Sequence, residues 1–228
     1  MKQQRQKSSH QSVNTTRVDR SVYTLTLAYV DNSVYNALMP TSNAKTKPPA
    51  RQRILDTAHD LFYRDGIRAT GVDRIIAESG VTKVTLYRHF PSKNELIKAY
   101  LEYRHEILIA HLTAKLLQPK KAGCSLRTTI ISTLREWFDS KEYRGCAFIN
   151  SVVEMQGVLP EVADISKHHK DEVLKLITTA LHASKNSDEI ALAISVAMDG
   201  AILRSQMEKA SAPALNALDT ILLALLEE

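Results

Sequence analysis

From Arg51 to its end the chain repeats apolar residues at helical spacing, and this period is the feature that most restricts how it can fold. The first such segment places five apolar side chains on one helix face: Ile54, Leu55, Ala58, Leu61 and Phe62. No segment after Arg51 alternates in the way that predicts a β-strand. The sequence therefore predicts an all-α fold.

Glycine, proline and capping residues mark the ends of the predicted helices. Gly66 is expected to end the first helix as a left-handed cap, and Gly80 to end the second. Thr70 and Thr82 are expected to cap the second and third helices, and Ser92 to open a fourth. The predicted helices cover about 51–66, 71–79, 82–89, 92–117, 125–139, 146–156, 160–182, 188–207 and 213–225, with a loop at about 118–124.

The first 48 residues differ from the rest of the chain. They are rich in Gln, Ser, Asn and Thr, and they carry the whole net charge of +5, because the remaining basic and acidic residues balance. Only residues 22–30 resemble a short strand, and they have no second strand to pair with. We expect a basic, mostly disordered extension that either adds non-specific DNA affinity or has no function. Another possibility is that the natural chain begins at Met39.

Several classes of protein are disfavoured by the sequence. No apolar run reaches the roughly 20 residues of a membrane span, and no secretory signal is present, so a cytoplasmic protein without a membrane partner is expected. Cys124 and Cys146 form neither a disulfide framework nor a zinc-ligand pattern. No GxSxG, P-loop, HExxH or glycine-rich dinucleotide turn occurs. We therefore expect neither an enzyme nor a bound metal or cofactor.

Residues 71–90 have the pattern of a helix-turn-helix: two short helices joined by a turn at Gly80. The small side chain of Ala77 is expected to let the helices approach, and Val81 and Leu86 to anchor the second helix in the core. The residues between these anchors should face outward: Lys83, Val84, Thr85, Tyr87 and Arg88. A helix of this length fits the major groove of DNA, so a sequence-reading role is predicted.

The segment VTKVTLYRHFPSKNELI resembles the TetR/AcrR family of regulators, most closely between Arg51 and Leu101. The matching residues are Thr70, Ile75, Ala77, Gly80, Val81, Thr82, Leu86, Tyr87, His89, Phe90, Lys93 and Leu96. Val84 departs from the pattern, because many members have a small residue or proline there. The resemblance implies a DNA-binding domain at 49–111 and an effector-binding and dimerisation domain at 112–228. It also implies a homodimeric repressor that a small effector releases from a palindromic DNA operator.

Roles at the DNA are carried over by motif position. The residues that resemble base-edge readers are Lys83, Val84 and Thr85, and those that resemble phosphate contacts are Tyr87 and Lys93. Thr70 and Thr82, at predicted helix N-termini, resemble phosphate caps. Arg88 and His89 are equally well explained as DNA contacts or as solvated surface residues. Tyr87 has the alternative of covering the edge of the core.

The rear helices are expected to hold the effector and the dimer interface. Candidate pocket walls are Tyr103, Ile107, Trp137, Phe138, Cys146, Phe148, Met155 and Met198, an apolar set suited to a lipophilic effector, although each also fits plain core packing. Candidate dimer faces are Ile190, Ala193, Ile194, Ala197, Gly200 and Ala201 on one helix and Leu215, Leu218, Ile221, Leu222 and Leu225 on the last, with packing inside the monomer as the alternative.

Two further interpretations remain open at the level of sequence. The chain could be a DNA-binding protein that responds to no effector. It could also be a thiol-based redox sensor, because Cys146 follows Arg144 and Gly145 at a predicted helix N-terminus, where a thiol is activated. A small buried thiol is the more ordinary explanation for Cys146.

Overall fold

The computed structural model describes residues 47–117, 124–181, 186–208 and 210–226, which fold into α-helices with no β-strand among them. The all-α prediction is confirmed. The helices are α3 (Ala50–Asp65), α4 (Val72–Ser79), α5 (Lys83–His89), α6 (Lys93–Leu117), α7 (Leu126–Phe138), α8 (Ala147–Met155), α9 (Glu161–Ala180), α10 (Ser187–Glu208) and α11 (Ala212–Leu226). Each predicted helix is found with ends that differ by at most two residues. The predicted N-terminal extension, apart from residues 47 and 48, and nearly all of the loop at 118–124 lie outside the described residues.

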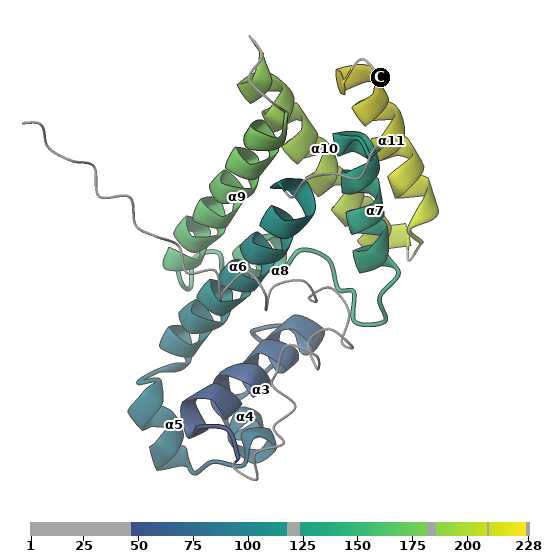
Figure 1. The fold of residues 1–228 in the computed structure, drawn as a ribbon. Coiled ribbons are helices and arrows are strands. Elements are labelled where there is room, and N and C mark those ends of the chain that lie inside the picture. The colour runs from purple at the N-terminus through teal and green to yellow at the C-terminus, as the bar shows by residue number, and fades with distance from the viewer. Residues whose placement is uncertain (1–46, 118–123, 182–185, 209, 227–228) are drawn as a thin grey trace, which may run out of the picture.

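Helices α3, α4 and α5 gather at one end of the molecule and form a small head (Figure 1). Ile54 and Leu61 of α3, Ile75 of α4 and Leu86 of α5 are almost fully buried, so each short helix is held by its apolar face. Gly80 ends α4 with φ 61° and ψ 42°, the left-handed conformation that glycine adopts at little cost. The side chain of Thr82 then caps α5 by accepting a hydrogen bond from Thr85 N.

Three local expectations about the head are wrong. Gly71 and not Thr70 is the N-cap of α4, because the Thr70 hydroxyl lies buried and donates to the carbonyl of Gly66 at 2.7 Å. Gly66 does end α3, but with φ 90° and ψ 156°, which is outside the left-handed helical region. Ala77 is exposed, so it does not bring two helices together.

Helix α6 connects the head to the rear of the molecule. Its first turns pack against α3, and its later turns lie between α9 and α7 (Figure 1). The domain boundary predicted at residue 111 falls inside this helix. Helix α6 is therefore shared by the two parts and joins them without an intervening loop.

The rear consists of α7 to α11 packed against the distal part of α6 (Figure 1). Ser125 caps α7 by accepting a hydrogen bond from Thr128 N. Pro160 lies immediately before α9, where the missing backbone N–H of proline costs no helical hydrogen bond. Helix α10 packs against both α9 and α11. Five of the eleven residues expected on the dimer face are buried within the monomer instead: Ile194, Ala201, Leu215, Leu218 and Leu222.

One helix, α10, is long and apolar enough to cross a membrane by length and composition alone. Two neighbouring helices pack against it, and its Asp199 forms an ion pair with Lys170 of α9. These contacts are those of a bundle helix with one outward apolar face. The expectation that the protein has no membrane partner stays a prediction.

Candidate nucleic-acid interface and effector cavity

Helix α5 presents a row of uncovered side chains at the free end of the head. Leu86 is fully buried and fixes the rotation of the helix, so the residues around it face outward. Val84 is 77% exposed and Tyr87 39%, and Lys83 and Arg88 are exposed as well. An exposed mixture of cations, a hydroxyl and a branched apolar group matches what a major groove offers: acceptors, phosphates and thymine methyl groups.

A single arginine holds the turn that precedes α5. Arg53 of α3 donates from Nε to the carbonyl of Ser79 at 3.1 Å and from Nη2 to that of Gly80 at 3.2 Å. These carbonyls end α4 and have no helical partner of their own. Arg53 therefore fixes the angle between the two helices of the motif, a role that the sequence pattern did not indicate.

The other expected DNA contacts are placed differently. Lys93 donates from Nζ to the carbonyl of Ile67 at 2.6 Å, and burial lowers its pKa. Thr70 is fully buried, so its hydroxyl faces the core and not the surface. Thr82 and Thr85 share a hydrogen bond of 2.9 Å between their hydroxyls on the outer side of the head, and His89 is half-buried. Of the expected DNA contacts, the exposed ones are thus Thr82, Lys83, Val84, Tyr87 and Arg88.

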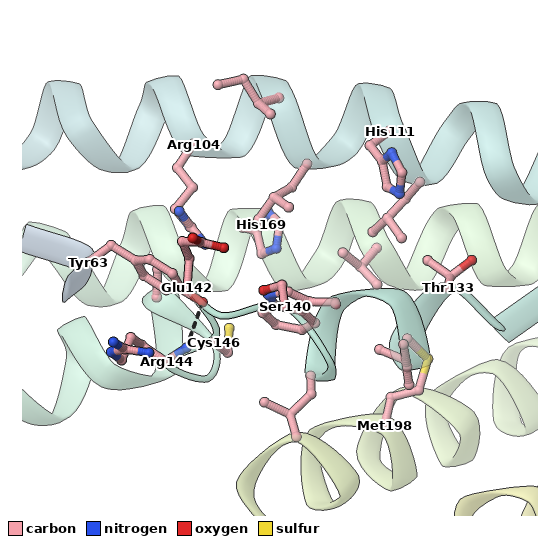
Figure 2. A pocket seen from close by; sticks show the side chains of 18 of the residues that line it. Tyr63, Arg104, His111, Thr133, Ser140, Glu142, Arg144, Cys146, His169 and Met198 are labelled. Carbon is pink, nitrogen blue, oxygen red and sulfur yellow. Dashed lines mark hydrogen bonds between the residues drawn. The ribbon is translucent and has the colours of Figure 1, made fainter. Parts of the chain in front are cut away.

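A cavity of about 460 Å³ lies between the head and the rear helices. Its walls come from α6, α7, α9 and α10, and α3 of the head closes one side with four residues: His59, Asp60, Tyr63 and Arg64. The size is within the range of sites for small organic molecules. Figure 2 shows side chains from these helices converging on the space.

The cavity includes half of the side chains that the sequence nominated. Ile107, Trp137, Cys146 and Met198 line it. Four others do not: Tyr103, Phe138, Phe148 and Met155. Tyr103 points around α6 toward His59, Phe148 stacks on His169 with ring centroids 3.7 Å apart, and Phe138 packs on Tyr143. Aromatic and methionine content could not separate wall from core, because both environments favour the same side chains.

The polar residues that line the cavity were not among those predicted from the sequence. Arg104, His111, Thr133 and His169 are buried and face the cavity (Figure 2). Burial lowers the pKa of His169 to about 3 and that of His111 to about 4, so both rings are neutral near pH 7. The signal was present in α6, where Arg104 and His111 fall on the face that otherwise carries Leu101 and Leu108.

Three sets of hydrogen bonds join the cavity region to the head. Arg104 Nη1 lies 3.1 Å from His59 Nε2, and the guanidinium stacks over the Tyr63 ring at 3.8 Å. The Tyr63 hydroxyl donates to the carbonyl of Gly145 and accepts from Arg144 N (Figure 2).

The third set runs from α8 to the loop after α3. Glu154 Oε2 accepts from Ile67 N at 2.7 Å and from Arg68 N at 3.1 Å. Helix α8 directly follows the segment that contains Cys146, so this carboxylate connects one wall of the cavity to the base of the helix-turn-helix.

Known proteins share this fold. Residues 54–100 match the model of a family described as bacterial regulatory proteins, tetR family. The fold is similar to a TetR-family transcriptional regulator from Streptomyces coelicolor, with a TM-score of 0.69, 28% identity and coverage of 81% of this chain and 91% of that one. Residues 54–100 are thus those of a TetR-type DNA-binding domain, and the fold is similar to that of a TetR-family regulator. These similarities confirm the expectation of a helix-turn-helix domain of the type found in DNA-binding regulators of transcription.

Two other similarities differ in extent. The fold of E. coli NemR in its reduced form covers 76% of this chain and 95% of NemR, with a TM-score of 0.65 and 20% identity. An HTH-type transcriptional regulator of Staphylococcus aureus is 39% identical over 61 residues, which are 27% of this chain and 33% of that protein. The chain thus matches about a third of the length of that relative.

Proposed function

We propose that the protein is a cytoplasmic homodimeric repressor that binds a palindromic operator and leaves it when a small effector enters the cavity. It needs no metal or cofactor for this. In the described residues no group of His, Cys, Asp and Glu side chains is arranged to hold a metal ion.

The observation that carries this proposal is the position of the cavity. His59 and Tyr63, from the first helix of the head, line it together with Arg104 from α6. A molecule in the cavity therefore touches the DNA-binding part directly. An effector shifts an equilibrium only by the difference in its affinity for the two states, and contacts that change when the head tilts supply such a difference.

The DNA-reading step is assigned to α5. Lys83, Val84 and Thr85 stand at the end of α5 that would enter the major groove first, and Tyr87 and Arg88 flank them. Two half-sites about one helical turn apart need two such helices at a fixed spacing. A tilt of each head changes this spacing, so a small motion at the cavity releases both halves of the operator.

An exposed apolar stripe supports the dimer. Along α10 the outward residues follow one another at helical spacing: Leu192, Val196, Gly200, Leu203 and Met207. No side chain of the described residues would meet a Cβ at Gly200, so another helix can approach closely there. Contiguous exposed apolar surface of this kind marks an interaction site. Gly200 belongs both to this stripe and to the face that the sequence favoured, whereas Ile194 and Ala201 of that face are buried.

The test is a titration of the purified protein against DNA from upstream of its own gene, at two salt concentrations, with random DNA as competitor. We expect binding that survives the competitor with two protomers per site. Binding that the competitor abolishes at both salt concentrations would contradict the proposal, because phosphate contacts alone lack sequence preference.

Two alternatives are separated by the same complex. An effector-independent protein would stay bound with every small molecule tried. A thiol sensor would release DNA after oxidation, and Cys146→Ser would remove that response. Cys146 lies buried but lines the cavity, so oxidants would have to enter by the same route as an effector.

A further inference from the structure

The cavity contains a buried cation without a matching carboxylate. Arg104 is 7% exposed, and its Nε has no hydrogen-bond partner. Among the residues that the structure describes, no carboxylate forms an ion pair with its guanidinium, which hydrogen-bonds to the His59 ring and lies over the Tyr63 ring. Burying a charge is costly unless an opposite charge or hydrogen bonds compensate it.

The rest of the lining adds to this positive character. Five basic side chains line the cavity, against three carboxylates: Asp60, Glu142 and Asp199. Asp199 already pairs with Lys170, Asp60 hydrogen-bonds to His59, and Glu142 forms no ion pair with Arg104. The site is therefore prepared for an anion at Arg104.

A second polar point lies farther along the same helix. His111 Nε2 and Thr133 Oγ1 are buried and have no hydrogen-bond partner among the described residues. Arg104 and His111 are seven residues apart on α6, two turns on one face, which separates their Cα atoms by about 10 Å. Figure 2 shows Arg104 toward one end of the cavity and His111 and Thr133 toward the other.

The walls between these two points are mostly apolar, with His169 and Ser140 as polar exceptions (Figure 2). Ile107, Leu108 and Leu112 of α6 face Trp137, Met198 and Ile202. A burial-lowered pKa keeps His111 neutral, so this end offers a neutral donor or acceptor and not a second cation.

We propose that the effector is an amphipathic organic acid: a carboxylate bound by Arg104, an apolar body of about 10 Å, and a hydroxyl or carbonyl that hydrogen-bonds to His111 and Thr133. The proposal rests on the proposed function for its regulatory meaning, but ligand binding itself needs no DNA. A carboxylate at Arg104 competes with His59 and Tyr63 for the guanidinium. Binding of a charged effector therefore changes the contact between α6 and the head.

Trp137 provides the measurement, since it is the single tryptophan of the chain and lines the cavity. The probes are ω-hydroxydecanoate, its amide ω-hydroxydecanamide, and decanoate, each titrated into the full-length protein without DNA while Trp137 fluorescence is followed. We expect saturable binding in which the hydroxy acid binds about tenfold more tightly than its amide. It should also bind several-fold more tightly than decanoate, which lacks the distal hydroxyl.

Three variants locate the effect. Arg104→Gln should remove the preference for acid over amide, and Thr133→Val should remove the preference for the hydroxy acid over decanoate. The matched control is Lys98→Gln, which removes one positive charge from α6 outside the cavity and should change neither preference. Circular dichroism checks that each variant keeps its helices, and the acid–amide comparison on the native protein needs no variant.

Native protein that binds acid and amide equally, or binds neither acid, would overturn the inference. So would an Arg104→Gln variant that keeps the acid preference. Failure of the proposed function looks different: the acid would bind while the upstream DNA would not. Conversely, a protein that binds its operator specifically but shows no acid preference keeps the proposed function and loses this inference.

Discussion

Arg104 of α6 and His59 of α3 meet across the boundary between the two parts of the molecule, with 3.1 Å between Nη1 and Nε2. Both side chains are buried, and the nearby cation helps burial to lower the pKa of His59. A neutral imidazole can accept a hydrogen bond from the guanidinium but cannot neutralise its charge. The contact therefore joins head and rear while leaving the cation uncompensated.

We expect Arg104→Met to stabilise the free protein. The substitution removes a buried charge that lacks a carboxylate partner and keeps a long side chain, so the free energy of unfolding should rise by about 1 kcal/mol in urea titrations. Lys98→Met, which breaks an exposed pair with Glu95, should change it by less than about 0.5 kcal/mol. A clear loss of stability in Arg104→Met would mean that its contacts with His59 and Tyr63 outweigh the cost of burial.

Acid should weaken the fold before most carboxylates titrate. The folded-state pKa values of His169, about 3, and His111, about 4, lie below the value of about 6.5 of an unfolded histidine. Between these values the unfolded chain binds more protons than the folded one. Stability is therefore complete above about pH 6.5 and falls as the pH is lowered toward 4.

For each histidine the loss at pH 5 should be about 2 kcal/mol relative to pH 7. Urea unfolding at the two pH values measures it. His169→Gln removes the titrating group, so the difference between pH 7 and pH 5 should shrink, whereas exposed His168→Gln should leave it nearly unchanged. Equal pH dependence in native protein and His169→Gln would show that His169 titrates normally.

The helices were predictable because each has its own local signals. Thr82 and Ser92 cap helices as expected, and Gly80 takes the left-handed conformation. The cavity was predictable only in part, since its walls depend on how helices rotate against one another. Ile107 and Phe148 are both apolar, yet one faces the cavity and the other stacks on His169.

Some polar residues of the cavity could have been predicted from their position on an otherwise apolar helix face. Arg104 lies in register with the buried face of α6, and a cation in such a position is a functional candidate. Thr133 gave no such signal, because a threonine in a helix is ordinary, and only the unmatched hydroxyl in the folded cavity distinguishes it. The role of Glu154 also had no signal in the sequence, because its partners are backbone amides more than 80 residues earlier in the chain.

Lys83 and Tyr87 should affect DNA binding in different ways. Lys83→Ala is expected to relax base preference by about 1–3 kcal/mol at one position of each half-site, because a base-edge contact discriminates between bases. Tyr87→Phe removes only a hydroxyl and should weaken binding to all sequences alike. Competition between operator and single-base variants measures both. If Lys83→Ala leaves affinity and selectivity intact, α5 is docked differently.

Gly66→Ala should loosen the connection between head and rear. Gly66 has φ 90° and ψ 156°, a conformation that essentially only glycine adopts, and an added Cβ would lie 2.6 Å from Glu154 Oε1. The substitution should lower the free energy of unfolding by roughly 1–3 kcal/mol. Gly71→Ser is the control, since a Cβ there meets nothing within 4 Å and serine is a favourable N-cap. A stable Gly66→Ala variant would show that Glu154 moves aside without cost.

The stripe on α10 should control both assembly and DNA binding. Val196 is 64% exposed and Leu203 48%, and neither side chain is needed for the core of the monomer. The double variant Val196→Lys with Leu203→Lys places like charges opposite one another across a two-fold interface, so sedimentation should show a folded monomer.

Loss of the dimer should also lower operator affinity by about a hundredfold, because the second half-site no longer binds as part of the same complex. Val153→Lys is the matched control: it is 72% exposed on α8, away from the stripe, and should leave the dimer and operator affinity unchanged. A double variant that remains dimeric would place the interface elsewhere. A monomer that keeps full operator affinity would show that one head suffices for recognition. That result would contradict a model in which two heads bind two half-sites at a fixed spacing.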